Sequence, residues 1–208
     1  QSKQYGTTPH IRLLRMAPLA PTDNMAWDTA TLRKVNQLQY FSGRWQRSDT
    51  ATAAPFSAIG WFFAGKLQQE LKVPVGIIEI AVGGSTTESW IDRFTMEQDP
   101  LLTDELYHWR TSDFYQPWCR ERAAVNLARS TDPLQRHPYG PCYNYEAGIA
   151  PFTGFPVCGA IWYQGESNAH NPEQHAALLP ALVKSWRRQW GYEFPFYYVQ
   201  LSSLDRPS

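Results

Sequence analysis

The stretch "GAIWYQGESNAHNPEQ", residues 159–174, joins a hydrophobic strand, a polar turn and the opening of a helix. The turn, residues 164–168, consists only of small or hydrogen-bonding residues. Asn171 followed by Pro172 is typical of a helix start, because Asn caps free N–H groups and proline fits the first helical position. The pattern therefore predicts a helix over 171–191. The turn before it either connects two elements or forms part of a binding site.

Hydrophobic segments elsewhere in the chain indicate an α/β fold. Strands are predicted at 10–16, 74–84, 157–165 and 195–204, and a further helix at 55–73. Strands this hydrophobic leave no face for water, which favours a parallel sheet covered on both sides by helices. In such sheets ligands bind beyond the carboxyl ends of the strands. Two of those ends, at 83–85 and 164–166, are expected to face one crevice.

The composition limits the classes of function. The chain has 208 residues, 43% of them hydrophobic and 18% charged, and its formal net charge is zero. Binding to nucleic acid or to a membrane surface needs a concentrated basic patch, so neither partner is expected. One domain over 1–208 is expected, with a possible insertion at about 95–142, where the pattern is hard to interpret.

The three cysteines have no metal-type spacing, so no metal site is expected. Their odd number allows at most one disulfide, and a Cys119–Cys142 bond is conceivable. Cys158 enters a predicted strand and is expected to be a buried thiol.

The segment "AVGGSTTESW", residues 81–90, runs from a strand into paired glycines. A glycine lets the backbone approach a ligand closely, and the N–H of Gly84 could then donate to a developing oxyanion. The alternative is a tight turn in which Ser85, Thr86 or Thr87 caps the next helix. The spacing fits neither a dinucleotide fingerprint nor a phosphate loop, so no nucleotide cofactor is expected.

The second turn carries Gln164 and Glu166. The carboxamide of Gln164 has two N–H donors, which could stabilise an oxyanion at the end of a buried strand. Glu166 could act as a base, orient a neighbour or cap the following helix. The alternative is that Glu166, Ser167 and Asn168 only satisfy backbone donors.

Three segments together resemble the sialate O-acetylesterase family, within the SGNH hydrolases. They are "PFSAIGWFFAGKLQQELKVPVGIIEIAVGGSTTESWI", "YNYEAGIAPF" and "GAIWYQGESNA". The resemblance implies an ester hydrolase that uses a serine, a histidine and usually an aspartate. It also implies a three-layer α/β/α sandwich around a mostly parallel, flavodoxin-like sheet, with no metal or organic cofactor. An exported or lysosomal location (periplasmic, secreted or lysosomal) follows from the resemblance alone.

Carried over by the resemblance, Gly84 and Gln164 would be oxyanion donors and Glu166 a supporting residue. Candidate substrate-binding residues are Ser85, Asn168 and Trp90; Trp90, like Trp109 and Trp118, could instead be packed in the core. The implied substrate is an O-acetylated sialic acid or a related sugar, and acetylated plant polysaccharide is an alternative.

The chain departs from the family pattern at two points, since it has neither a Gly-Gln-Ser-Asn nucleophile segment nor an Asp-x-x-His segment. A catalytic domain incomplete at both ends is therefore expected. The rest of the same gene product would complete the site, and the isolated chain would be inactive. Two alternatives are a non-catalytic sugar-binding protein and an internal triad. The triad would draw on Ser85 or Ser167, His170 or His175, and Glu166 or Asp205.

Overall fold

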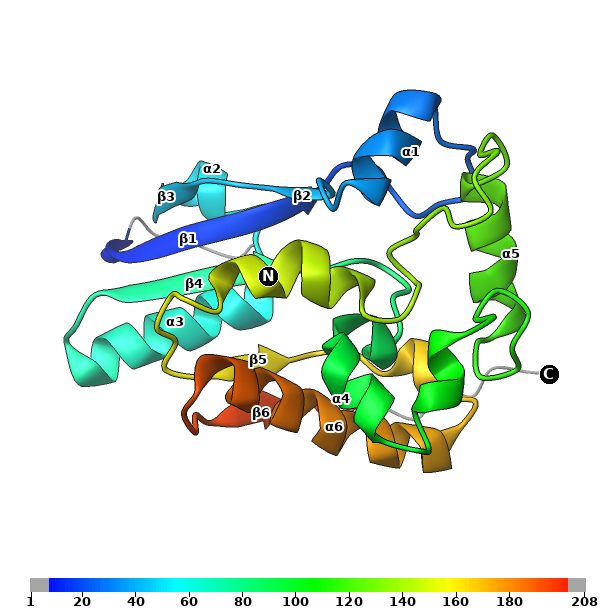
Figure 1. Ribbon diagram of the computed structural model, residues 1–208. Coiled ribbons are helices and arrows are strands. Elements are labelled where there is room, and N and C mark those ends of the chain that lie inside the picture. Colours follow the sequence, from blue (N-terminus) through cyan, green and yellow to red (C-terminus); the bar gives the residue numbers. More distant parts are fainter. Residues whose placement is uncertain (1–7, 202–208) are drawn as a thin grey trace. The chain divides into compact units, whose positions relative to one another are not determined.

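The computed structural model describes residues 8–201, which divide into two compact units (Figure 1). Within these residues the first unit comprises 8–19 and 41–81, and the second comprises 20–40 and 82–201. The expected single domain over 1–208 stays a prediction. Both turns proposed for the site, and the segment 95–142, belong to the second unit.

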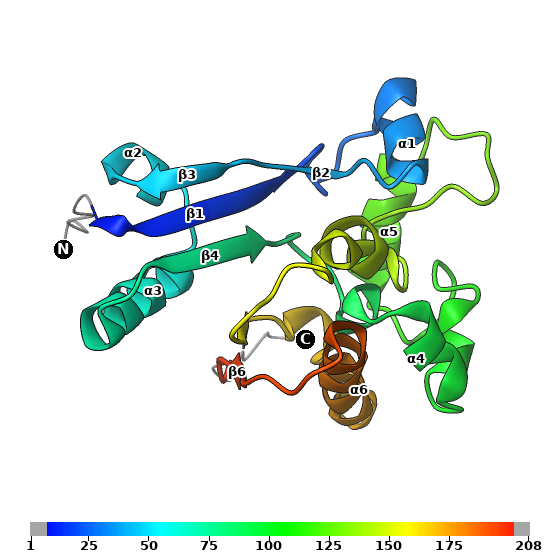
Figure 2. The same cartoon turned by 60° about the vertical axis from the view of Figure 1, so that its left-hand side comes forward.

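The first unit is a small mixed sheet with a helix on one face (Figures 1 and 2). Its elements are β1 (Thr8–Pro18), β2 (Phe41–Ser42), β3 (Trp45–Ser48), α2 (Thr50–Ala53), α3 (Ala58–Leu71) and β4 (Val75–Ile80). Strand β1 pairs with β4 in parallel and with β2 and β3 in antiparallel. Helix α3 packs on β1 and β4. The hydrophobic core of this first unit contains Ile11, Leu13 and Ala64, which are buried, together with the half-buried Ile77.

The start of α3 shows how local sequence places the helix. Ser57 is its N-cap, and the Ser57 side chain accepts a hydrogen bond from the Gly60 N–H. The Ser57 N–H donates to the carboxylate of Glu79, on β4, at 2.8 Å. The predicted helix at 55–73 is thus confirmed, and it begins three residues later than Pro55 because Ser57 caps it.

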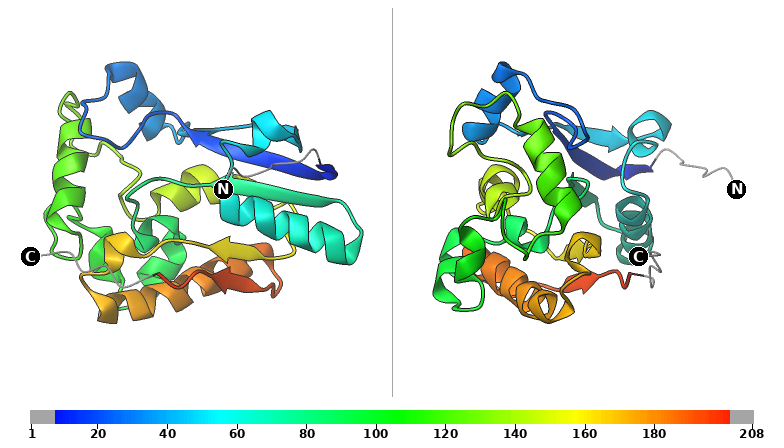
Figure 3. Two further views of the ribbon diagram at one scale, coloured as in Figure 1. Left: turned by 180° about the vertical axis from the view of Figure 1, so that it is seen from behind. Right: turned by 90° about the vertical axis from the view of Figure 1, so that its right-hand side faces the viewer.

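The second unit contains most of the helices and a parallel pair of strands. Its elements are α1 (Thr29–Asn36), η1 (Thr87–Trp90), α4 (Arg93–Gln98), η2 (Thr103–Leu106), α5 (Pro117–Asn126), η3 (Tyr145–Ile149), η4 (Ala150–Phe152), β5 (Ala160–Trp162), η5 (Glu166–Asn168), α6 (Pro172–Trp190) and β6 (Phe196–Tyr198). Strands β5 and β6 pair in parallel, and α6 connects them along one side (Figure 3). Helix α6 also contacts η1 and α4.

Helix α6 follows its sequence signals closely. The Asn171 side chain accepts from the N–H of Gln174, and Pro172 is the first helical residue. The helix ends at Trp190 and is capped by Gly191, which has a φ of 75°. The four predicted strands also appear, each with different ends. No helix within residues 8–201 is long and apolar enough to cross a membrane.

An aromatic cluster packs α6 against β5 and η1. The ring of Trp162 lies edge-on to the rings of Trp90 and Trp186, with centroids 6.1 Å from each. The indole N–H of Trp186 donates to the carbonyl of Trp90 at 2.9 Å. The same side chain therefore packs by its ring and satisfies its polar N–H.

Two expectations from the sequence need correction. The sheet of the first unit is mixed, because residues 41–48 form the antiparallel strands β2 and β3, which were not predicted. The conceivable Cys119–Cys142 disulfide and the expected burial of Cys158 are wrong as well. Cys119 and Cys142 are buried free thiols, and Cys158 is exposed because β5 begins only at Ala160.

We expect Leu182→Ala to lower the free energy of unfolding by about 2–5 kcal/mol, because Leu182 is fully buried and its loss leaves a cavity. Urea denaturation followed by circular dichroism measures the change. Leu101→Ala is the control, since Leu101 is 72% exposed and its truncation should change stability by no more than about 0.5 kcal/mol. Equal losses in both variants would contradict the packing described for α6.

Candidate functional site

The two polar turns predicted from sequence lie against each other in the second unit. Gln164 joins them through its whole carboxamide. Its Nε2 donates to the carbonyl of Ser85 and to Oδ1 of Asn168, both at 3.0 Å. Its Oε1 accepts from the hydroxyl of Thr87 at 2.6 Å. The expectation that 83–85 and 164–166 lie close together is therefore confirmed.

Asn168 makes the second connection between the turns. Its Oδ1 accepts from the N–H of Thr87 at 2.9 Å and from the Thr87 hydroxyl at 3.1 Å. Its Nδ2 donates to the carboxyl group of Glu88 at 2.9 Å. Asn168, Thr87 and Glu88 are all fully buried. Bonds of this kind are strong away from water, so they fix the geometry of the two turns.

Gly84 occupies a backbone conformation that favours glycine. Its φ is 81°, and a Cβ atom there would lie 2.4 Å from the hydroxyl oxygen of Tyr139. Its carbonyl accepts from the hydroxyl of Ser167 at 3.1 Å. Among the described residues its N–H makes no hydrogen bond.

The other predicted site residues differ in exposure. Ser85 and Trp90 are buried, and the Trp90 indole N–H donates to the hydroxyl of Ser85 at 3.0 Å. Trp90 is therefore a packed residue here, as the alternative interpretation from sequence has it. Glu166 is exposed, and within residues 8–201 its carboxylate forms no hydrogen bond or ion pair. The supporting role of Glu166 stays a prediction, as do the substrate-binding roles of Ser85, Asn168 and Trp90.

The histidines are not hydrogen-bonded to the candidate serines anywhere in the described part of the chain. The Ser167 hydroxyl donates to a carbonyl, and the Ser85 hydroxyl accepts from Trp90. His175 is half-buried, and burial lowers its pKa. His170 is exposed. Asp205, the other proposed orienting residue, lies outside the described residues.

Residues from the segment 95–142 contact the second turn, which the sequence did not reveal. The Gln116 Nε2 donates to the carbonyls of Glu166 and Ser167, both at 3.1 Å. The Gln116 Oε1 accepts from the Trp118 indole N–H at 2.7 Å. Trp118 also lies beside Gly84, where a Cβ atom would come within 2.9 Å of its ring. This segment therefore supports both turns.

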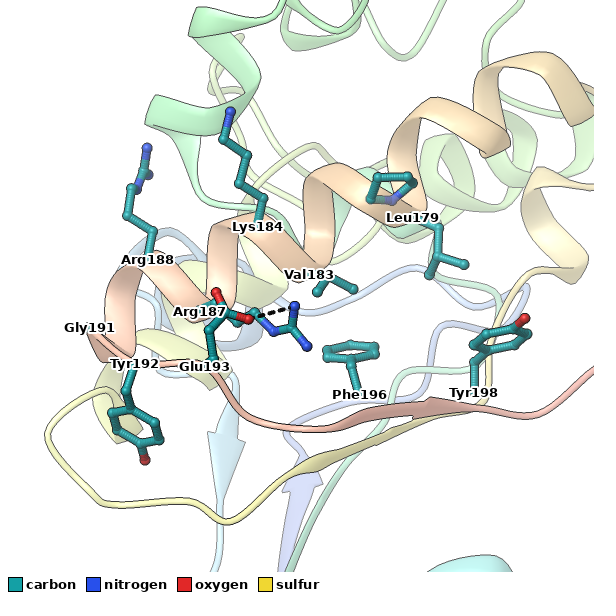
Figure 4. A pocket seen from close by; sticks show the side chains of 11 residues that line it. Leu179, Val183, Lys184, Arg187, Arg188, Gly191, Tyr192, Glu193, Phe196 and Tyr198 are labelled. Atoms are coloured by element: carbon teal, nitrogen blue, oxygen red, sulfur yellow. Dashed lines mark ion pairs between the residues drawn. The ribbon is translucent and has the colours of Figure 1, made fainter.

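A separate groove of about 860 Å³ lies between α6 and β6 (Figure 4). Leu179 and Val183 of α6 face Phe196 and Tyr198 of β6 across it. None of the predicted site residues lines it. Across residues 8–201 no group of three or more histidine, cysteine, aspartate or glutamate side chains is placed to hold a metal ion.

Comparison with known proteins supports the resemblance inferred from the three segments. The mouse (Mus musculus) sialate O-acetylesterase is 31% identical, in an alignment covering 71% of this chain and 29% of the mouse protein. The rat (Rattus norvegicus) enzyme is 30% identical, in an alignment covering 71% of this chain and 30% of the rat protein. The human (Homo sapiens) enzyme is 26% identical, in an alignment covering 71% of this chain and 25% of the human protein. The resemblance to the sialate O-acetylesterases is confirmed. No family model matches the chain.

The chain spans less than a third of the length of the sialate O-acetylesterases that it matches. A solved structure, that of a carbohydrate acetylesterase from Xanthomonas citri, superposes with a TM-score of 0.60 at 24% identity. That superposition covers 93% of this chain and 34% of the other. It shows a shared α/β fold.

We expect Gly84→Ala to lower the free energy of unfolding by at least about 1–2 kcal/mol, because a side chain at positive φ is strained. The overlap with Tyr139 adds to this cost. The matched control is Gly83→Ala, since a Cβ atom at Gly83 meets no atom within 4 Å. Urea denaturation of both variants checks the difference, and a Gly83 variant as unstable as the Gly84 variant would contradict it.

We expect Thr87→Val to cost about 1–3 kcal/mol of stability, because it leaves the Oε1 atom of Gln164 without its donor. Thr87→Ser keeps the hydroxyl and should retain most of the stability. The same denaturation measurement applies. A valine variant as stable as the serine variant would show that this hydrogen bond does not hold the turns together.

Proposed function

We propose that this chain is part of an ester hydrolase that removes O-acetyl groups from sugars through a serine acyl-enzyme. The observation that carries the proposal is the junction of the two turns, which leaves the Gly84 N–H without a partner among the described residues. The names of the relatives, sialate O-acetylesterase and carbohydrate acetylesterase, support the same chemistry. The proposed fold of the complete domain is a three-layer α/β/α sandwich of the SGNH type.

In the proposed mechanism, a serine outside these 208 residues attacks the acetyl carbonyl, and a histidine, also outside them, takes its proton. The carbonyl oxygen becomes negatively charged in the tetrahedral intermediate, and the Gly84 N–H donates to it. The bond from the carbonyl carbon to the sugar oxygen then breaks, and the sugar hydroxyl leaves with the proton that the histidine returns, so that the acetyl group stays on the serine. A water molecule, activated by the same histidine, hydrolyses the acetyl-serine and releases acetate. No metal or organic cofactor takes part in this scheme.

Gln164 can act as an oxyanion donor only if one of its present hydrogen bonds breaks. Both hydrogens of its Nε2 are already donated, to Ser85 and to Asn168. Gln164 can donate to an oxyanion only if the substrate displaces one of these acceptors. Asn168 is buried and also bonded to Thr87 and Glu88, so we propose that the bond to the Ser85 carbonyl is the one exchanged. Glu166, which is exposed, would act as a supporting hydrogen-bonding residue for the oxyanion donors.

The proposed substrate is an O-acetylated sialic acid, with acetylated plant polysaccharide fragments as the alternative. Ser85, Asn168 and Trp90 are buried, so in this proposal they form the bottom of the substrate-binding site. The remainder of the gene product completes the site. An exported or lysosomal location, and the lack of nucleic-acid or membrane partners, remain part of the proposal.

We expect the isolated 208-residue chain not to hydrolyse p-nitrophenyl acetate above a buffer control, because neither candidate serine hydrogen-bonds a histidine within the described residues. Release of p-nitrophenol at 405 nm measures turnover. Turnover that disappears in Ser85→Ala would refute the incomplete-site proposal and favour an internal triad.

We expect the product of the whole encoding gene to release acetate from O-acetylated sialic acid. In it, Gln164→Ala should lower kcat by about 10²–10³, the usual effect of losing one oxyanion donor. Gln37→Ala, at an exposed glutamine, is the matched control and should leave kcat unchanged. A gene product that binds the sugar by calorimetry without releasing acetate would instead identify a non-catalytic sugar-binding protein.

A further inference from the structure

Residues 82–85 of the second unit form a β-turn around the peptide group that joins Gly83 to Gly84. The N–H of Ser85 donates to the carbonyl of Val82 at 3.2 Å, which closes the turn. Gly84, the third residue, has a φ of 81°, the value typical of a type II turn. The central peptide of this turn therefore contributes the Gly83 carbonyl and the Gly84 N–H, the proposed oxyanion donor.

The direction of this N–H depends on the orientation of the central peptide. Type I and type II turns differ by a rotation of that peptide through roughly half a turn. Because both central residues are glycines, no Cβ atom opposes either turn type. The peptide is planar and trans, so its carbonyl oxygen and its N–H point in opposite directions. Groups that hold the Gly83 carbonyl therefore also set the direction of the Gly84 N–H.

Two hydroxyl groups hold the Gly83 carbonyl. The Tyr139 hydroxyl donates to it at 2.8 Å and the Thr22 hydroxyl at 2.9 Å. The Thr22 carbonyl lies farther from the Tyr139 hydroxyl, at 3.4 Å, so the bond to Gly83 is the stronger one. A carbonyl oxygen has two lone pairs, and both are used here. A rotation of the central peptide would break both hydrogen bonds at once.

Tyr139 is itself held by a buried histidine. The Tyr139 N–H donates to Nδ1 of His137 at 3.0 Å, and the two rings lie edge to face with centroids 4.8 Å apart. Burial lowers the pKa of His137 to about 3, so its ring is neutral near pH 7. Because Nδ1 accepts, Nε2 carries the hydrogen and donates it to Oδ1 of Asn126 at 3.1 Å.

The same Asn126 side chain holds the loop that contains Thr22. Its Nδ2 donates to the carbonyl of Asp23 at 2.6 Å and to that of Met25 at 2.8 Å. Asn126 is fully buried, as is Tyr139. One network of hydrogen bonds therefore places both hydroxyl donors, although they are 61 and 56 residues from Gly83 in sequence.

We propose that Thr22 and Tyr139 are positioning residues for the oxyanion donor, because their hydroxyls keep the turn at 82–85 in its type II form. The Gly84 N–H then points away from both hydroxyls. Hydrogen bonds to a carbonyl also polarise its peptide, which strengthens the N–H as a donor. Neither side chain touches the reacting atoms. The effect on catalysis rests on the proposed function, whereas the orientation of the peptide does not.

The first test is kinetic and uses the product of the whole encoding gene with O-acetylated sialic acid. Tyr139→Phe and Thr22→Val should each lower kcat about tenfold, and the double variant by about 10², as expected when a catalytic group is displaced. KM should stay unchanged, because the bond to the oxyanion forms only in the transition state. Thr22→Ser keeps the hydroxyl and should restore kcat. A double variant with the wild-type kcat would overturn the proposal.

Two matched controls separate positioning from a general loss of buried hydrogen bonds. The Tyr143 hydroxyl donates to the carbonyl of Val35 at 2.9 Å, and the Thr153 hydroxyl donates to that of Ala150 at 3.0 Å. Tyr143→Phe and Thr153→Val therefore remove bonds of the same kind elsewhere, and both should leave kcat unchanged. Losses in these controls equal to those in the test variants would contradict a specific role.

The second test observes the central peptide directly and needs no turnover. Gly83 and Gly84 are the only adjacent glycines in the 208-residue chain. Glycine labelled with carbon-13 at its carbonyl and with nitrogen-15, under conditions that block its conversion to serine, therefore gives one HNCO signal. A strong nuclear Overhauser effect from the Gly83 α-protons to the Gly84 N–H is expected in the wild type, as in other type II turns.

In the double variant the carbonyl signal should move upfield and the nuclear Overhauser effect should weaken, while the two controls keep both. An unchanged nuclear Overhauser effect would overturn the positioning role even if kcat falls. A gene product that releases no acetate would refute the proposed function, yet the labelled chain would still show whether the two hydroxyls orient the peptide. The two proposals can therefore fail separately.

Discussion

The hydrogen bonds of one buried side chain, Asn168, hold together the part of the molecule where chemistry is proposed. Its carboxamide accepts from Thr87, accepts from Gln164 and donates to Glu88, so it bridges segments about eighty residues apart in sequence. A carboxamide is suited to this task because it both donates and accepts without carrying charge. Without it, several buried polar groups would lose their partners at once, at a cost that few surface interactions could offset.

The same hydrogen bonds place Gln164 where an oxyanion donor is needed, but they also occupy both of its donor hydrogens. Its position at the end of β5 places it beside the glycine turn, but its carboxamide is already fully bonded. A donor held in this way loses little conformational freedom when it acts, although it must break a bond to do so. The Gly84 N–H has no such cost, because it makes no hydrogen bond within residues 8–201 that would have to break.

Local sequence signals predicted the elements well where they were explicit. Asn171, Pro172 and Gly191 mark the ends of α6, and the glycines and polar residues after two strands indicated the turns that meet. The antiparallel strands at 41–48 were missed because they are short and mostly exposed, so no hydrophobic alternation marks them. The burial of Glu88 was missed because a buried glutamate cannot be told from a surface glutamate by sequence until its neighbours are known. Gln116 was missed because its contacts with η5 span fifty residues of sequence.

The exposure of Cys158, while Cys119 and Cys142 are buried, gives the folded chain one accessible thiol among its cysteines. A maleimide dye would therefore attach at a single known point, two residues before β5. The strand that ends in the Gln164 turn would then carry a spectroscopic reporter, placed there without any engineered cysteine.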